Sequence, residues 1–153
     1  MNLRVDGLAR LEASFLALEA LDEDQIWGII EPAAQLLRER MQAVILRLFK
    51  QSTGSLHDSI EIQRKLSRGG AVYALVGPND KKHTRVVLGL RESKRTKKKT
   101  IKGTNAEIGW ILEHGSARIP GRHWMKTACD ESEEEIRAML QDGFNAACEA
   151  AGL

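Results

Sequence analysis

The side chains with the greatest potential for catalysis or metal binding are four histidines and two cysteines, some of which gather in one stretch. Glu113 and His114 are adjacent, and His123 and Cys129 follow them. Their spacing matches neither a Cys-x-x-Cys zinc pair nor a His-Glu-x-x-His helix. The sequence also lacks a nucleophile elbow, a phosphate-binding loop and a dinucleotide-binding glycine motif. We therefore predict a protein that is not an enzyme and uses no metal or cofactor. A metal-dependent enzyme built on Glu113, His114 and His123 is the weakest alternative.

A basic run is the second group with binding potential. Seven cations fall between Arg91 and Lys102, and such a cluster can bind phosphates by releasing counterions. A solvated loop has the same composition, and no aromatic residues are interleaved to stack on single-stranded bases. Because apolar residues are almost absent, we predict a mobile basic loop over residues 91–103. Its candidate channel-facing or DNA-facing residues are Lys94, Arg95, Lys97, Lys98, Lys99 and Lys102.

The bulk composition limits the class of protein. The chain has 153 residues and a formal net charge of +2, so one domain is the default and bulk charge indicates neither a nucleic-acid binder nor a membrane protein. No stretch has the pattern of a secretory signal or the roughly 20 apolar residues of a membrane span. Cys129 and Cys148 fall near or on the last predicted helix, roughly 28 Å apart, so we expect reduced thiols and a cytoplasmic origin.

Hydrophobic periodicity predicts two helices in the first third of the chain. Apolar residues recur at three- and four-residue steps over about residues 7–21, which indicates an amphipathic helix. Asp22 and Asp24 offer a second helix start, and Glu31-Pro32 marks either a kink or a fresh start. From there an apolar face continues to Phe49, which predicts the longest packed helix.

Alternating residues then predict strands. Ile60 and Ile62 begin the first strand, residues 72–76 form the second and residues 86–90 form the third. Their short links, including the predicted turn Arg68-Gly69-Gly70, favour an antiparallel meander covered by helices from both ends of the chain. A fourth strand fits the same pattern.

The last third reads as a helix, an exposed loop and a second helix. Thr104 and Glu107 have the spacing of a capping box, so a short helix is expected to end at Gly115, with Trp110 widening its apolar stripe. The final helix is expected to begin near Asp130 or Ser132.

The loop between these helices carries a third candidate site. In one interpretation, Glu113 pairs with an arginine, either Arg118 or Arg122 of the same chain or one in a neighbouring subunit. In the alternative interpretation, Trp124 anchors the loop in the core and Glu113 caps a helix or faces water. Both interpretations stay open at this point.

The predicted organisation is a single α+β domain over residues 1–153. An antiparallel sheet of three to four strands is packed by a long N-terminal helix and a C-terminal helix, with a short helix before the last loop. The parts are an N-terminal helical extension (1–31), the long helix and β meander (32–90), the mobile basic loop (91–103), and the short helix, loop and C-terminal helix (104–153).

Two blocks of this sequence resemble a family of tailed-bacteriophage proteins, the HK-type gene-product-ten-like tail components. Trp110 to Ser116 and Pro120 to Ala128 are similar to the family's pattern of an aromatic helix, Glu-x-Gly-Ser/Thr and a proline- and arginine-containing loop. The upstream block resembles Thr-Gly-x-Leu-x-x-Ser-Ile, and Val76-Gly77-Pro78 lies between the two. The residues of the upstream block are Thr53, Gly54, Leu56, Ser59 and Ile60.

The resemblance covers roughly residues 33–151 and has departures. No proline precedes Thr53, His114 replaces an aromatic residue, and Trp124 replaces phenylalanine. The lysine-rich segment after Leu90 has the character of an insertion.

The resemblance implies a structural protein of the phage neck, a tail completion or tail terminator subunit. Such subunits form homo-oligomeric rings, commonly hexamers, around the DNA channel and join the tail-tube protein to head connector or stopper proteins. Assembly in the bacterial cytoplasm, incorporation into the virion and no membrane contact are then expected, with only non-specific contact to packaged DNA. The residues assigned to subunit or partner contacts are Glu113, His114, Gly115, Arg118, Arg122 and Trp124. A small nucleic-acid-binding module that uses the lysine-rich loop is the alternative.

Overall fold

The computed structural model describes residues 16, 21–49, 54–88 and 98–150, and its helices and strands form an α+β fold as predicted. The predicted helix of residues 7–21 lies outside the described residues except for Leu16 and Leu21. In chain order the elements are α2 (Glu23–Leu48), α3 (Ser55–Asp58), β1 (Ile60–Leu66), β2 (Val72–Pro78), β3 (Lys82–Leu88), β4 (Lys98–Thr104), α4 (Asn105–His114), β5 (Gly115–Ser116), β6 (Ile119–Pro120) and α5 (Trp124–Ala150).

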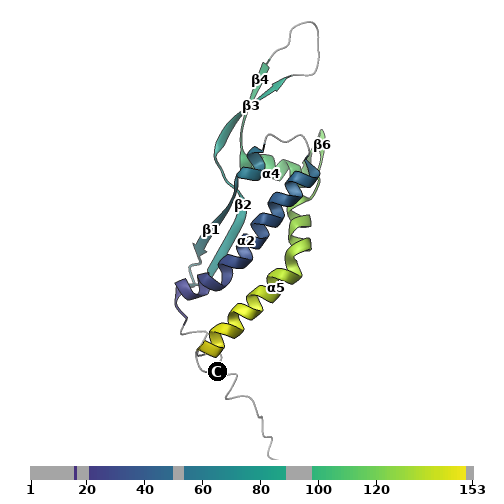
Figure 1. Ribbon diagram of the computed structural model, residues 1–153. Helices are drawn as coiled ribbons and strands as arrows, with labels where there is room; N and C mark the ends of the chain where they lie inside the picture. Colours follow the sequence, from purple (N-terminus) through teal and green to yellow (C-terminus); the bar gives the residue numbers. More distant parts are fainter. Residues whose placement is uncertain (1–15, 17–20, 50–53, 89–97, 151–153) are drawn as a thin grey trace, which may run out of the picture.

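Helix α2 is the central layer of the molecule. It lies between the β1–β2 hairpin and α5, which runs along its opposite side (Figure 1). The buried core joins α2 to β1, α3 and the start of α5. Its members are Met41, Val44, Ile45, Leu56, Ile60, Trp124 and Ala128. The two long helices and the hairpin therefore share one apolar centre.

Helix α2 begins earlier than the predicted division of the chain at residue 31. Asp22 accepts a hydrogen bond from the backbone N–H of Gln25, and the Gln25 side chain accepts one from the Asp22 N–H, which forms a capping box. Pro32 lies inside a continuous helix. It removes the hydrogen bond to the carbonyl of Gly28, and because both residues are exposed, water can satisfy that carbonyl. The boundary between residues 31 and 32 therefore falls within one element.

The strands form two separate hairpins, and the predicted three-stranded meander is wrong for the described residues. Strand β1 pairs with β2, and β3 pairs with β4, each antiparallel. The chain does not turn back after β2 because the backbone of residues 79–81 is already bonded. Asn79 donates to the Ser59 carbonyl (2.9 Å), and Ala106 and Asn105 donate to the carbonyls of Asn79 and Lys81 (3.1 and 3.4 Å). The chain therefore continues into β3, and the second hairpin extends away from the helices (Figure 1).

The predicted mobile loop of residues 91–103 is wrong for its second part. Residues 98–104 form β4, which is in register with β3 from Lys98 opposite Leu88 to Thr104 opposite Lys82. Cross-strand backbone hydrogen bonds order a segment without needing apolar side chains, and this contribution was missing from the prediction. Lys98, Lys99 and Lys102 are thus strand residues, whereas Lys94, Arg95 and Lys97 lie outside the described residues.

Helix α5 begins at Trp124, several residues before its predicted start. Ser132 is not a cap: it is fully buried, and its hydroxyl donates to the Ala128 carbonyl one turn earlier (2.7 Å). The true cap comes from another helix, as described below, so no local capping sequence marks this start. Cys129 and Cys148 both lie on α5 and are free.

Trp124 fills the centre of the core. Its side chain is fully buried, and its indole N–H donates to the carbonyl of Gly109 on α4 (3.0 Å). Replacing Trp124 with phenylalanine would remove this hydrogen bond and open a void in the core.

We expect Trp124→Phe to lower the free energy of unfolding by about 1–3 kcal/mol. Trp110→Phe is the matched control, because Trp110 is 64% exposed and the same change there should cost less than about 0.5 kcal/mol. Urea unfolding followed by circular dichroism measures both. Equal losses for the two variants would contradict the assignment of Trp124 to the core.

Candidate interaction surface on α4

Helix α4 has the boundaries that its capping signals predict. The Thr104 hydroxyl accepts from the Glu107 N–H (3.1 Å), and the Glu107 carboxylate accepts from the Thr104 N–H (2.9 Å). Gly115 ends the helix at φ +87°. A Cβ at Gly115 would lie 2.6 Å from the Gly121 nitrogen, so only glycine allows the β5–β6 turn to lie against the helix end.

The buried face of α4 carries small or polar residues. Asn105, Gly109 and Glu113 are the buried positions of this helix, spaced four residues apart. Residues at this spacing share one face of a helix. Of the apolar residues of α4, Leu112 packs against the core, whereas Trp110 and Ile111 are exposed. Each of the three buried residues has a specific partner.

Asn105 belongs to a buried polar network. Its amide donates to the Asn79 side-chain oxygen (3.0 Å), and its own side-chain oxygen accepts from the Ser55 hydroxyl (3.1 Å). The Asn79 amide in turn donates to the Glu61 carboxylate (2.7 Å). Buried polar groups need such partners because an unpaired one costs free energy. The network joins α3, β1, the end of β2 and the start of α4.

Gly109 permits the close approach of three segments. A Cβ at this position would lie 3.0 Å from the Pro78 ring, 3.4 Å from Trp124 and 3.5 Å from Leu56. A larger residue would push these side chains apart, and overpacking of this kind destabilises a core.

Glu113 caps α5 from a different helix. Its carboxylate accepts hydrogen bonds from the backbone N–H groups of Met125 (2.6 Å) and Lys126 (3.2 Å), in the first turn of α5. A carboxylate at a helix N-terminus satisfies free N–H groups and complements the helix dipole. Only 6% of Glu113 is exposed.

Within the described residues, Glu113 therefore bonds to α5 and to neither Arg118 nor Arg122, whereas pairing with an arginine of a neighbouring subunit stays a prediction. The Arg122 guanidinium instead donates to the Leu48 carbonyl (2.9 Å) and lies 5.7 Å from the Phe49 ring centre. Glu113 and Trp124 are both buried in the chain, so their contacts are internal. The alternative interpretation, a cap and a core anchor, describes these two residues.

The outer face of α4 is apolar and exposed. Trp110 is 64% exposed and Ile111 is 37% exposed. The Trp110 ring contacts the His114 ring of the next turn, with centroids 3.8 Å apart. Ile119 on the adjacent β6 is also exposed. We call Trp110, Ile111, His114 and Ile119 the α4 surface.

The α4 surface has the chemistry of a protein contact. Large amphipathic aromatic residues are enriched where proteins associate, because they bury much apolar area at little entropic cost. His114 and the nearby exposed Arg118 add polar groups beside the apolar centre, as in the rim of an interface. Of the six residues predicted for subunit contacts, His114, Arg118 and Arg122 are exposed, and Arg122 also bonds within the chain.

The upstream motif has an internal role at its described positions. Gly54 precedes α3 with φ +76°, and Leu56, Ser59 and Ile60 are all buried. The Ser59 hydroxyl donates to the Leu56 carbonyl (2.7 Å). Thr53 lies outside the described residues.

The described residues hold no group of three or more histidine, cysteine or acidic side chains placed to bind a metal. The oxygens of Glu113 are bonded to α5, so this carboxylate is engaged in structure. Partial burial raises the pKa of the Cys129 thiol, and the charges of Asp130 and Glu113 act in the same direction. A thiol shifted in this way is a weak nucleophile near neutral pH.

Comparisons with protein-family models, curated proteins and solved structures found no match. Within the described parts of the chain, no helix has both the length and the apolar character needed to cross a membrane.

The sequence interpretation missed the buried network around Asn79 and Asn105. Neither Asn79 nor Asn105 was assigned a partner from the sequence. Each asparagine lies beside a predicted element boundary. This position does not reveal that they bond to each other, because they are 26 residues apart in the chain.

We expect Glu113→Gln to lower the free energy of unfolding by about 1–3 kcal/mol, because one amide oxygen replaces two charged acceptors at the start of α5. Glu134→Gln is the control. Glu134 is an exposed residue of α5, so its replacement should change stability by less than about 0.5 kcal/mol. Thermal unfolding at pH 7 measures both. A Glu113→Gln protein as stable as the control would contradict the capping role.

The pH dependence of stability provides a test of the network. Hydrogen bonds from Asn79 and Lys81 lower the pKa of Glu61 below its ordinary value of 4.5. The stability that Glu61 contributes is therefore present above its unfolded pKa and lost as the pH falls through its lower folded pKa. Glu61→Gln should melt below the wild type at pH 7, and the difference should shrink as the pH falls well below the ordinary pKa of 4.5. A difference that persists there would exclude this carboxylate as the cause.

Proposed function

We propose that this protein is a structural subunit of the neck of a long-tailed bacteriophage, a tail completion or tail terminator component that forms a ring and joins the tail tube to the head connector. The observation that carries the proposal is the exposed α4 surface. The neighbouring residues Glu113 and Trp124, by contrast, make their hydrogen bonds within the chain. A subunit that works by fitting against other chains needs such a surface, whereas an enzyme needs a site of reactive groups.

The arrangement of the motifs supports the resemblance to tail components. Leu56 of the upstream motif, Pro78 of the intervening segment and Trp124 of the downstream motif all surround Gly109. Three segments that are separated in the sequence thus pack around Gly109. The size of the side chain in each segment limits the size allowed in the others. This is the expectation for motifs that define one subunit fold.

In this proposal the subunit acts through geometry. The α4 surface contacts a neighbouring subunit or the tail-tube protein, and the heterologous contacts close into a ring, which we expect to be a hexamer. The β3–β4 hairpin carries Lys98, Lys99 and Lys102 on β4 and is assigned to the channel or an adjacent ring, where non-specific contact with packaged DNA needs only positive charge.

Particle assembly tests the proposal. A phage that lacks this protein should accumulate filled heads and unjoined tails, seen by electron microscopy. The wild-type protein should restore joined particles, and Trp110→Asp should reduce them at least tenfold, because a charge in the α4 surface opposes burial. Leu46→Asp is the control, since Leu46 is 57% exposed on α2 and lies outside the α4 surface.

Both variants should keep the wild-type melting temperature, which separates a lost contact from a lost fold. Normal joining of heads to tails without this protein would refute the proposed function. Normal joining with Trp110→Asp would refute only the role of the α4 surface. Portal, connector and tail-tube genes beside the gene would add independent support.

A further inference from the structure

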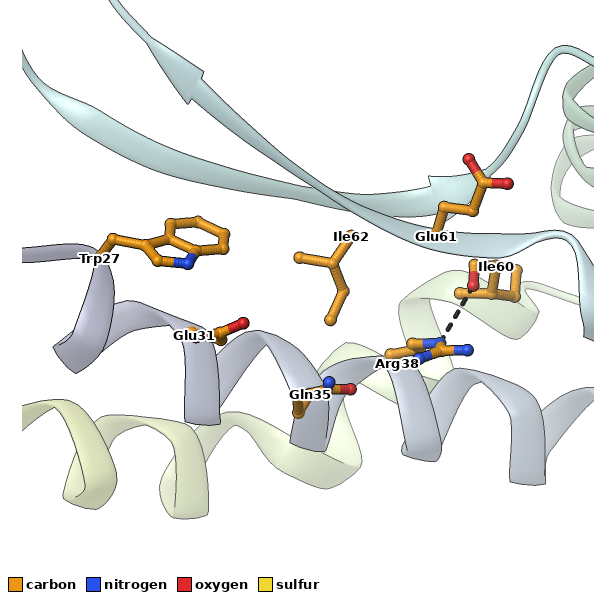
Figure 2. A pocket seen from close by; sticks show the side chains of 7 residues that line it. All are labelled: Trp27, Glu31, Gln35, Arg38, Ile60, Glu61 and Ile62. Atoms are coloured by element: carbon orange, nitrogen blue, oxygen red, sulfur yellow. Dashed lines mark hydrogen bonds between the residues drawn. The ribbon is translucent and has the colours of Figure 1, made fainter. Parts of the chain in front are cut away.

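A groove runs between α2 and the first strand of the hairpin (Figure 2). It is a hollow of about 380 Å³, and its apolar lining comes from Trp27, Ile60 and Ile62. Glu31 and Gln35 line it from α2, and both are exposed. None of these groups belongs to the α4 surface, so the groove is a separate feature of the molecule.

The groove lies along an open strand edge. Hydrogen bonds join Ser59 to Asn79 and Ser67 to Ala71, just beyond the two ends of β1 and β2. In an antiparallel pair, bonded and non-bonded positions alternate. The backbone groups of Ile60, Ile62 and Arg64 must therefore point to the other edge of β1. Among the described residues, no strand lies beside that edge.

Side chains from α2 close both ends of this edge. At one end, the Arg38 Nε donates to the Ile60 carbonyl (3.1 Å), which uses an outward-facing backbone group. At the other end, Arg64 bonds to Asp24 (2.7 Å) and lies 5.7 Å from the Trp27 ring centre. The backbone of Ile62 lies between these closures. The stretch from Ile60 to Arg64 is about 13 Å long, so a short extended segment can lie along it and bond to the backbone of Ile62.

An occupant must be an extended chain with apolar residues at alternate positions. Its backbone would bond to β1, and its inward side chains would meet Trp27 and Ile62. Its outward side chains would lie on the face of β1 that carries Glu61 and Lys65, so charges of both signs fit there. The sequence Asn2-Leu3-Arg4-Val5-Asp6 has this alternation, with Leu3 and Val5 apolar and Arg4 and Asp6 charged.

We propose that the 2–6 segment of a second copy of this chain occupies the groove as a strand added to β1. Distance favours a second copy. The predicted helix of residues 7–21 would span about 22 Å. The stretch of α2 from Asp24 to Arg38, which flanks the groove, spans about 21 Å. A helix that folded back along its own α2 would carry the 2–6 segment past its own groove.

This contact joins two different surfaces, the segment of one copy and the groove of the next. It is therefore heterologous and can link subunits into a ring. The proposal does not depend on the neck assignment, because it rests on the open edge and the 2–6 sequence. The α4 surface and the groove provide separate contacts, so each can fail without the other.

Disulfide trapping between two variants tests the proposal. In a full-length background with Cys129→Ser and Cys148→Ser, one protein carries Val5→Cys and another, marked by a mass tag, carries Gln35→Cys. Mixing them under mild oxidation should yield a crosslinked pair with one copy of each. The control acceptor is Glu39→Cys, an exposed residue of α2 that does not line the groove, and the Gln35→Cys yield should be at least fivefold higher.

Light scattering of the full chain gives the second measurement. Val5→Asp should weaken self-association at least tenfold with an unchanged melting temperature, whereas Arg4→Gln should have little effect. Equal crosslinking at positions 35 and 39 would overturn the proposal. Crosslinking only within a chain that carries both cysteines would overturn the second copy as the occupant. If Trp110→Asp abolished phage assembly but the crosslink between positions 5 and 35 still formed, the result would support this contact as separate from the α4 surface.

Discussion

The structure depends on the bond between the Glu113 carboxylate and the free N–H groups at the start of α5. This contact fixes where α5 begins and turns the chain sharply after α4. It also places Trp124 against Gly109, so that the indole N–H donates to the Gly109 carbonyl. The long helix can then run back along α2 and complete the core. A buried carboxylate is costly unless bonded, and here each of its oxygens has a partner.

The same constraint explains the exposed apolar face of α4. Because Asn105, Gly109 and Glu113 face inward to make their contacts, Trp110 and Ile111 of this short helix are exposed, whereas Leu112 packs against the core. A short helix that leaves a tryptophan and an isoleucine exposed is poorly suited to an isolated chain. It is well suited to one that meets other chains, which is the basis of the proposed role in a phage neck. The open edge of β1 gives the subunit a second such surface on another side.

Local signals in the sequence were sufficient for several elements. The Thr104–Glu107 capping box and Gly115 set both ends of α4, since a cap and a positive φ are satisfied within a few residues. Alternation from Ile60 and the glycines after Arg68 likewise identified the β1–β2 hairpin. The α+β class followed from these elements. The role of Trp124 as a core anchor was one of two interpretations that the residue types allowed.

The sequence by itself determined the α+β class, both ends of α4 and the β1–β2 hairpin. Only the tertiary structure decided the start of α5, the separation into two hairpins, the strand formed by the lysines of β4, and the outward direction of Trp110. In each case the deciding partner is distant in the chain: Glu113 for the α5 N-terminus, the start of α4 for residues 79–81, and β3 for β4. Periodicity reports only which neighbours share a face, whereas hydrogen bonds between distant segments decide which face is buried.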